Sequence, residues 1–377
     1  MLIWQKENCA ISRKVALAGD FLPSGELTFS PGHGWGDMAG WVAPYFADVD
    51  AAIVNLECPL GATGLAPKPK IGLGANFTGC EDALEYLGSL GVGFVGLANN
   101  HIYDFGDEGV ARTTRAALRS KVAAIGVARK LSETPDVAVW RGPEKTSVGF
   151  WAAAQGLDDC ASLNRTGVEP ATLKRGLAAL EEIERRDARL KIALLHLGLE
   201  RTNRPDPDDV RLMRSLCKAG FDAVAAAHSH RISGWDSVAR PGRPTGFCFY
   251  GLGSLASSVV YSPLEREGLV VVLGLDREGE IAQIDVRPLY LRDAGWGAVP
   301  DGPTAARIEQ RFLDLSNEIA SDAFKAYFYK DAGQGFFHRQ MRDLKAAIQN
   351  GGLRGAAQKM GRIRARHLKR MVRAAFN

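Results

Sequence analysis

Long apolar runs and paired cysteines are both missing from this sequence of 377 residues. No uninterrupted apolar run reaches the roughly 18–20 residues that a membrane-spanning helix needs. The N-terminal stretch MLIWQKENCAISRK has no apolar core before its lysines, so we expect no secretory signal. The six cysteines are scattered without a C-x-x-C pair, which favours separate reduced thiols over disulfides or a thiolate zinc site. We therefore expect a cytoplasmic protein.

A large net charge is also absent, but the charges are unevenly distributed. The formal net charge is +4. Residues 335–377 hold eleven lysines and arginines against one aspartate, a net of +10, and the other residues hold 36 basic and 42 acidic side chains, a net of −6. A mildly acidic body thus precedes a strongly basic tail.

Short apolar runs alternate with amphipathic stretches over roughly the first 290 residues. Several early runs are apolar at consecutive positions, which is typical of strands covered on both faces. The alternation predicts an α/β fold with largely parallel strands, and the helix-poor region 237–289 predicts an antiparallel portion. The expected strands are 15–19, 51–57, 92–98, 122–127, 147–154, 191–198, 221–228, 246–254, 268–276 and 280–289, and the expected helices are 80–90, 107–120, 170–187 and 206–219.

The pattern changes after Pro300, so we expect a main domain over 1–295 and a helical, basic C-terminal extension over 296–377. Apolar residues recur at helical spacing in 304–329, and a glycine-containing break follows at 333–335. Residues 353–376 read as a basic amphipathic helix. This helix either packs on its own domain with a solvated basic face, or attaches the protein peripherally to an anionic membrane surface.

Polar residues gather where the predicted strands end. In open α/β sheets, ligands bind beyond the carboxyl ends of the strands, so these side chains should converge on one crevice. Carboxylate, amide oxygen and imidazole together suit divalent ions such as Mn, Fe, Zn or Co. The side chains in question are Asp20, Asn55, Glu57, Asn99, Asn100, His101, His196, Glu200, His228 and His230.

Most of these residues also have a purely structural interpretation. Asp20 is a common turn residue, the Asn pair at 99–100 precedes a predicted helix that it would cap, and a single His196 is more often a hydrogen-bonded core residue. His228 and His230 are harder to explain in this way. At the point where a strand passes into a loop, both imidazoles can reach a common site. Their shared placement favours a common site.

Six segments, in chain order, resemble the CapA family of bacterial capsule and poly-γ-glutamate synthesis proteins. The combination of N-L-E with A-N-N-H-x-x-D-x-G is the most specific part, and the tail after 300 has no recognised counterpart. The resemblance implies a metallophosphatase-like layered α/β/β/α sandwich with a C-terminal helical extension. The segments are LAGDF (17–21), DAAIVNLECPL (50–60), LGSLGVGFVGLANNHIYDFGDEGVARTTRAALRS (87–120), LLHLGLE (194–200), LCKAGFDAVAAAHSHRISGWD (216–236) and FYGLGSLASS (249–258).

The resemblance also implies a metal centre with one or two divalent ions, for which we expect Mn, Fe or Zn. Glu57 would bridge the two ions. Asp20 and His230 would bind the first ion, and Asn100, His196 and His228 would bind the second.

Three further residues would serve the reaction itself. His101 would lie near the leaving group as an acid or charge stabiliser. Asp104 would orient His101, and Glu200 would assist in metal binding or orientation.

This sequence departs from the family pattern at one ligand position. Metallophosphatases usually have Asp-x-His at the first strand, whereas Phe21 and Leu22 follow Asp20 here. The family's His-Trp-Gly and Gly-His-His-Pro-His also become HLG at 196–198 and AAHSH at 226–230. These departures fit either one ion or two, and either a catalytic protein or a non-catalytic one.

We predict a metal-dependent, hydrolase-like protein that acts on a phosphoester or a γ-glutamyl-type amide in the synthesis of a capsule or poly-γ-glutamate-type polymer. Its partner would be an anionic polymer or a phosphoester substrate, and the sequence indicates no oligomeric state. One alternative is a non-catalytic biosynthesis or export factor on the same fold, which the missing ligand favours. The other is a nucleic-acid phosphodiesterase, suggested by the basic tail. Because residues 340–375 contain no aromatic side chain for base stacking, we expect no specific nucleic acid.

Overall fold

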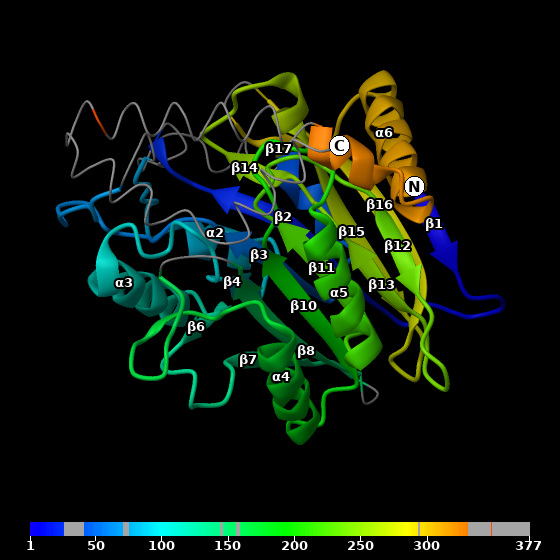
Figure 1. The fold of residues 1–377 in the computed structure, drawn as a ribbon, viewed down its shortest axis with the longest axis horizontal. Helices are drawn as coiled ribbons and strands as arrows, with labels where there is room; N and C mark the ends of the chain where they lie inside the picture. The colour runs from blue at the N-terminus through cyan, green and yellow to red at the C-terminus, as the bar shows by residue number, and fades with distance from the viewer. Residues whose placement is uncertain are drawn as a thin grey trace.

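Two large β-sheets face each other, and helices cover their outer sides (Figure 1). The computed structural model describes residues 1–25, 41–70, 75–143, 146–155, 159–292, 295–330 and 348. The layered α/β/β/α arrangement confirms the predicted fold class.

The first sheet is mixed. Its strands are β1 (Leu2–Gln5), β2 (Arg13–Leu22), β3 (Ala51–Leu56), β4 (Phe94–Gly96), β5 (Ala123–Ile125), β14 (Ser254–Ser257), β15 (Glu267–Leu275), β16 (Ile281–Leu291) and β17 (Gly297–Ala298). They lie in the order β1-β16-β15-β2-β3-β4-β5, with β14 paired to β2 and β17 to β16. The strands β2 to β5 run parallel, whereas β15, β16 and β1 add antiparallel neighbours. The antiparallel portion predicted for 237–289 is therefore confirmed for β15 and β16, whereas β14 pairs in parallel with β2 and β13 (Gly246–Phe249) in parallel with β11 (Ala223–Ala227).

The second sheet has a parallel centre and antiparallel edges. Its strands are β7 (Val137–Arg141), β8 (Ser147–Ala154), β10 (Leu190–His196), β11 (Ala223–Ala227), β12 (Trp235–Val238) and β13 (Gly246–Phe249). They lie in the order β12-β13-β11-β10-β8-β7. A small separate pair is formed by β6 (Val127–Ala128) and β9 (Gly167–Val168).

Alternate residues of the second sheet enter two different cores, which explains its consecutive apolar runs. In β8, Phe150 and Ala152 belong to the core that lies between the sheets. Trp151 and Ala153 belong instead to a core shared with the outer helices α4 (Leu173–Arg185) and α5 (Pro207–Ala219). Burial of one large apolar side chain contributes about 1.5–3 kcal/mol, so both faces of the sheet stabilise the sandwich.

The helix ends follow from local sequence. Helix α5 begins after Asp206, whose side chain accepts a hydrogen bond from the backbone N–H of Asp208, and Pro207 occupies its first turn. Gly220 follows its last residue at a φ of 148°, which glycine tolerates. The remaining helices are α2 (Ala83–Ser89), α3 (Gly106–Arg119) and α6 (Gly302–Ala320), and the short 3₁₀ turns are η2 (Ala43–Tyr45) and η3 (Pro263–Arg266).

Several predicted elements differ in their limits. The run 122–127 divides into β5 and β6 at Gly126, whose φ is 105°. The run 246–254 divides into β13 and β14, which belong to different sheets. The short strands β1, β7 and β12 were not predicted, because four or five residues carry too little periodic signal.

The predicted helix over 304–329 is α6 over 302–320 followed by a helical stretch over 324–330. Helix α6 packs against the sandwich through Ile308, Phe312 and Leu315, which join the core between the sheets. The domain boundary near residue 295 stays a prediction. The glycine break at 333–335 and the basic helix at 353–376 lie outside the described residues. Among the residues that are described, no helix has the length and apolar character to cross a membrane.

Candidate metal centre

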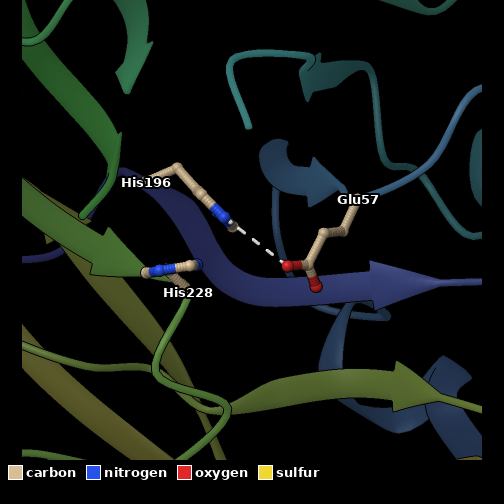
Figure 2. A group of neighbouring side chains, drawn as sticks. All are labelled: Glu57, His196 and His228. Carbon is tan, nitrogen blue, oxygen red and sulfur yellow. Dashed lines mark ion pairs between the residues drawn. The ribbon is translucent and has the colours of Figure 1, made fainter. Parts of the chain in front are cut away.

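The carboxyl ends of strands from both sheets meet at one point. Asp20 lies near the end of β2 and Glu57 directly follows β3. His196 ends β10, and His228 directly follows β11. Figure 2 shows Glu57, His196 and His228 with their side chains turned toward one another.

The donor atoms form two groups that share one carboxylate. Glu57, His196 and His228 form one group, and Asp20, Glu57 and His230 form the other, with the ligand atoms of each group within 4.8 Å of one another. The Oε1 atom of Glu57 lies 3.5 Å from Nε2 of His196, and its Oε2 atom lies 3.7 Å from Nδ1 of His230. One oxygen of Glu57 therefore faces each group, which is the geometry of a bridging ligand.

The chemistry of these atoms fits a divalent metal. Glu57 is fully buried, and neither of its carboxylate oxygens has a hydrogen-bond partner among the described residues. The Nδ1 atom of His228 is likewise buried without a partner there. Unpartnered buried polar atoms are costly, so their convergence indicates a ligand that satisfies them together. Carboxylate oxygens and imidazole nitrogens suit Mn, Fe or Zn.

His228 and His230 reach the centre from a turn that follows β11, where the backbone is no longer extended. His228 has a φ of 104° and His230 a φ of 54°, both in the region that non-glycine residues rarely adopt. The backbone N–H of His228 donates to Oδ2 of Asp20 at 3.0 Å, which ties this turn to the first sheet. Such strained backbone is typical of functional sites.

Close backbone packing brings β14 beside Asp20. A Cβ atom on Gly19 would lie 1.9 Å from the carbonyl oxygen of Gly253, so only glycine fits at position 19. Gly253 itself has a φ of 67°. The backbone N–H of Asp20 donates to the Gly253 carbonyl oxygen at 3.0 Å. These two glycines therefore fix the position of Asp20 against β14.

Two asparagines, absent from the predicted ligands, position the centre. The Nδ2 atom of Asn55 lies 2.7 Å from Oδ1 of Asp20 and 3.2 Å from Nδ1 of His196. Asn99 donates from Nδ2 to the carbonyl oxygen of Leu56 at 2.7 Å, and its Oδ1 accepts from the backbone N–H of His101 at 3.1 Å. Their occurrence in N-L-E and A-N-N-H is the sequence signal for this role.

Asn100 reaches the centre through His196. Its Oδ1 atom lies 2.7 Å from Nε2 of His196. Because Nδ1 of His196 accepts from Asn55, the Nε2–H group is the donor to Asn100. Binding of a cation at Nε2 would displace this proton and leave the amide oxygen beside the cation.

A Lys–Asp–His cluster joins the loop that leaves β4, which carries His101 and Asp104, to Lys70 in the segment after β3. Asp104 places Oδ2 2.8 Å from Nδ1 of His101. Its Oδ1 atom lies 2.6 Å from Nζ of Lys70, which is also 3.1 Å from Nδ1 of His101. The Phe77 ring packs edge-on against His101, with the ring centroids 4.8 Å apart. Lys70 was not predicted, since the two lysines in APKPKIG carry no recognisable signal.

Burial and charge shift the pKa values of the cluster in opposite directions. Burial, together with the charge of Asp20, raises the pKa of Glu57. Burial lowers the pKa of His196 well below its ordinary value and that of His228 to about 4. Both imidazoles are thus neutral at pH 7, which is the protonation state that metal binding by a ring nitrogen requires.

His230 behaves differently. Burial acts to lower its pKa, but the charge of Glu57 and the contact with Asp20 outweigh burial and raise the pKa to about 10. Its imidazolium balances the two carboxylates, a task that a divalent cation would also perform.

Glu200 and His101 complete the predicted set. The charge of Glu200 raises the pKa values of Glu57, His228 and His230, which places it electrostatically close to the centre. Burial lowers the pKa of His101, against the opposing effect of Asp104. The structure therefore gathers all nine predicted residues at this end of the sandwich, and their ligand and catalytic roles stay predictions.

The chain belongs to the family described as bacterial capsule synthesis protein PGA_cap, which matches residues 14–258. The predicted CapA resemblance is thereby confirmed. The chain is similar to the capsule biosynthesis protein CapA of Bacillus anthracis, with 22% identity over 67% of this chain and 61% of that protein. It is also similar to the PGA biosynthesis protein CapA of Bacillus subtilis (strain 168), with 24% identity over 57% of this chain and 55% of that protein. The matches thus span little more than half the length of these curated relatives.

Solved structures with a related arrangement include two nucleotidases. A 5'-nucleotidase precursor from Thermus thermophilus has a TM-score of 0.45 and 12% identity, over 82% of this chain and 59% of that chain. The NAD nucleotidase NadN of Haemophilus influenzae has a TM-score of 0.38 and 10% identity, over 72% of this chain and 62% of that chain.

Proposed function

We propose that this capsule-synthesis family member is a metal-dependent hydrolase that cleaves a phosphoester or a γ-glutamyl-type amide during the synthesis of an anionic surface polymer. The observation that supports this most is the Glu57 carboxylate, buried between two groups of donors with both oxygens unpartnered among the described residues. A stable fold gains nothing from such an arrangement without a ligand.

The residues divide the work between metal binding and proton transfer. Glu57 would bridge the two positions, with Asp20 and His230 on one side and His196, His228 and Asn100 on the other. When bound, the ions would polarise the bond to be cleaved and acidify a water molecule. In a holo structure we expect side-chain donors at roughly 2.0–2.3 Å from the metal.

His101 is suited to transfer a proton to or from the substrate. Asp104 holds its Nδ1 atom at 2.8 Å, which fixes the ring and leaves Nε2 as the nitrogen for the substrate. The ring edge contact with Phe77 restricts the imidazole further. Positioning of this kind is what general acid–base chemistry needs.

A hydrolysis screen with the full chain tests this proposal. Phosphodiesters, phosphomonoesters and poly-γ-glutamate would each be incubated with Mn²⁺, Fe²⁺ or Zn²⁺. We expect one substrate class to be cleaved in a metal-dependent reaction that EDTA stops and that His101→Ala slows while metal content is kept. Absence of turnover on every class, with metal bound, would contradict the catalytic proposal.

A non-catalytic factor on the same fold is the second candidate, because one ligand position is apolar. Leu22, where metallophosphatases usually have a ligand histidine, is buried at 2% exposure. Such a protein would bind metal and polymer without cleaving either. The same screen separates the two candidates, since this one predicts binding without turnover.

The basic segment 353–376 carries a separate proposal, peripheral attachment to an anionic membrane. Each basic residue near such a surface contributes about 1 kcal/mol, so the tail could hold the protein at low salt. Liposome co-sedimentation would compare the full chain with a version that ends at Gly335. Equal binding by both proteins, or no binding by either at low salt, would rule the attachment out.

A further inference from the structure

Two segments that leave the metal centre meet again at an arginine stacked on a tyrosine. Arg201 follows Glu200 in the segment after β10, and Tyr261 lies in the segment after β14. Ser254, in β14, places Oγ 3.4 Å from Nδ1 of His230. The guanidinium carbon of Arg201 lies 3.7 Å from the centroid of the Tyr261 ring. The stack therefore joins two segments that both begin beside ligand residues.

The main chain of Arg201 is fixed to the turn that carries the histidines. Its backbone N–H donates to the carbonyl oxygen of Ser229 at 2.8 Å, and Ser229 lies between His228 and His230. Arg201 has a φ of 63°, a backbone conformation that residues other than glycine rarely adopt. The backbone of Arg201 is thus held beside the centre in a strained conformation, as the backbone of functional sites often is.

The guanidinium group itself is available for a ligand. Within the described ranges, Arg201 makes no ion pair and donates no side-chain hydrogen bond. Arg231, a near neighbour on the turn, is in contrast bonded to Ser262 and Glu265 at 3.2 and 3.4 Å. Tyr261 is 66% exposed, so the stack stands at the surface with the N–H donors of Arg201 open.

We propose that Arg201, supported by Tyr261, binds an anionic group of the substrate other than the group at the metal centre. This inference rests on the proposed function, because it assumes that the metal centre binds one group of the substrate while Arg201 binds another. A planar guanidinium matches carboxylate and phosphate groups in a two-bond contact, and stacking pre-orders its plane. The substrate class is therefore a chain with repeated anionic groups, of which one lies at the metals and another at Arg201.

Binding measured by fluorescence anisotropy tests this without requiring turnover. The full chain, loaded with Mn²⁺, would be titrated into labelled oligo-γ-glutamate, a labelled short polyphosphate and an uncharged oligoglutamine. We expect at least one anionic oligomer to bind about tenfold more tightly than the neutral one. Arg201→Gln should lose about tenfold in that affinity, Arg201→Lys should recover part of it, and Tyr261→Phe should retain it.

Arg292→Gln is the matched control, because Arg292 is also stacked on an aromatic ring, with its guanidinium carbon 4.5 Å from the Trp41 centroid. Thermal melting and metal content would verify that each variant is folded and loaded. Unchanged affinity in Arg201→Gln, an equal loss in Arg292→Gln, or no anion preference in the wild type would overturn the inference. If hydrolysis fails but the Arg201 effect is found, only the catalytic proposal falls. The anion that responds to Arg201 decides between carboxylate and phosphate.

Discussion

The two sheets supply different donors to the metal centre and hold them by different means. The first sheet offers oxygen from Asp20, Glu57 and Asn100, and hydrogen bonds from Asn55 and Asn99 keep its strand ends in place. The second sheet offers imidazole nitrogen, and the turn that carries His228 and His230 has positive φ at both residues. One side is ordered by a polar network, and the other by strained backbone.

This difference shows why the centre depends on the sandwich as a whole. Neither sheet alone carries a complete donor group, since both groups combine carboxylates of the first sheet with histidines of the second. The backbone contact between His228 and Asp20 and the approach of Asn55 to His196 link the sheets at this point. Preorganisation of this kind lets a cation bind without further folding.

Replacement of the shared carboxylate should have the largest effect. Glu57→Gln removes one charge from both donor groups, so we expect nearly complete loss of bound metal and of any turnover. The variant should fold, because glutamine has nearly the shape of glutamate and carries no charge to bury. Burial already raises the pKa of the Glu57 carboxyl group, which shows that its charged form is costly there. Elemental analysis after desalting and a thermal melt would check both points. Retention of a full metal complement would show that Glu57 does not bridge.

The next test separates the two sides of the comparison. His228→Ala removes a ligand from the second sheet and should lose metal from one group. His101→Ala leaves both donor groups intact, and should lower turnover by about 10²–10⁴-fold while metal content stays near that of the wild type. Elemental analysis of both variants gives the answer, and similar metal loss in both would refute this division of roles.

The close approach of β2 and β14 can be broken by a single methyl group. Gly19→Ala would place Cβ 1.9 Å from the Gly253 carbonyl oxygen, and we expect the free energy of unfolding to fall by about 3 kcal/mol. Gly93→Ala is the control, since a Cβ there meets nothing within 4 Å, and its effect should stay within about 1 kcal/mol. Denaturant unfolding measures both, and equal values for the two variants would contradict the steric argument.

Lys70 tests how the loop after β4 holds Asp104 and His101. Lys70→Met removes a cation 2.6 Å from Asp104, which should loosen the Asp104–His101 contact and reduce kcat about tenfold, or about 1.4 kcal/mol in the barrier. Metal content should not change, and Lys70→Arg should restore part of kcat. Lys68→Met is the matched control, because Lys68 pairs with Asp159 instead. Equal activity of Lys70→Met and wild type would remove Lys70 from the site.

The sequence predicts the parts of this centre that residue type and strand order determine. Asp20, Glu57 and His196 could be placed because each ends or follows an apolar run, and parallel strands bring such ends together. Lys70 could not be placed, because its contact with Asp104 depends on how a loop folds back. Arg201 was missed for a similar reason, since its stacking on Tyr261 joins segments 60 positions apart in the chain.

The smallest expected effect lies far from the centre, where the first sheet is tied together by an exposed ion pair. Asp48 lies 2.7 Å from Nζ of Lys14 and 2.7 Å from a guanidinium nitrogen of Arg287, and its side chain is 47% exposed. The contact with Arg287 lowers the pKa of this carboxyl. A lowered folded-state pKa stabilises the fold fully above the unfolded pKa of about 4, and this stabilisation is lost progressively as the pH falls from there through the folded-state pKa. Asp48→Asn should therefore reduce the free energy of unfolding by about 0.5–1 kcal/mol at pH 7, since exposure screens the pair.

The difference in the free energy of unfolding between Asp48→Asn and wild type should shrink as the pH drops below about 4. Urea unfolding at several pH values measures this. Glu108→Gln is the comparison variant, because Glu108 is 52% exposed and pairs, among the described residues, only with Arg112 and Arg115 of its own helix, and its effect should be smaller than that of Asp48→Asn. A difference that grows toward acid pH would reverse the sign and rule out the ion pair as its source.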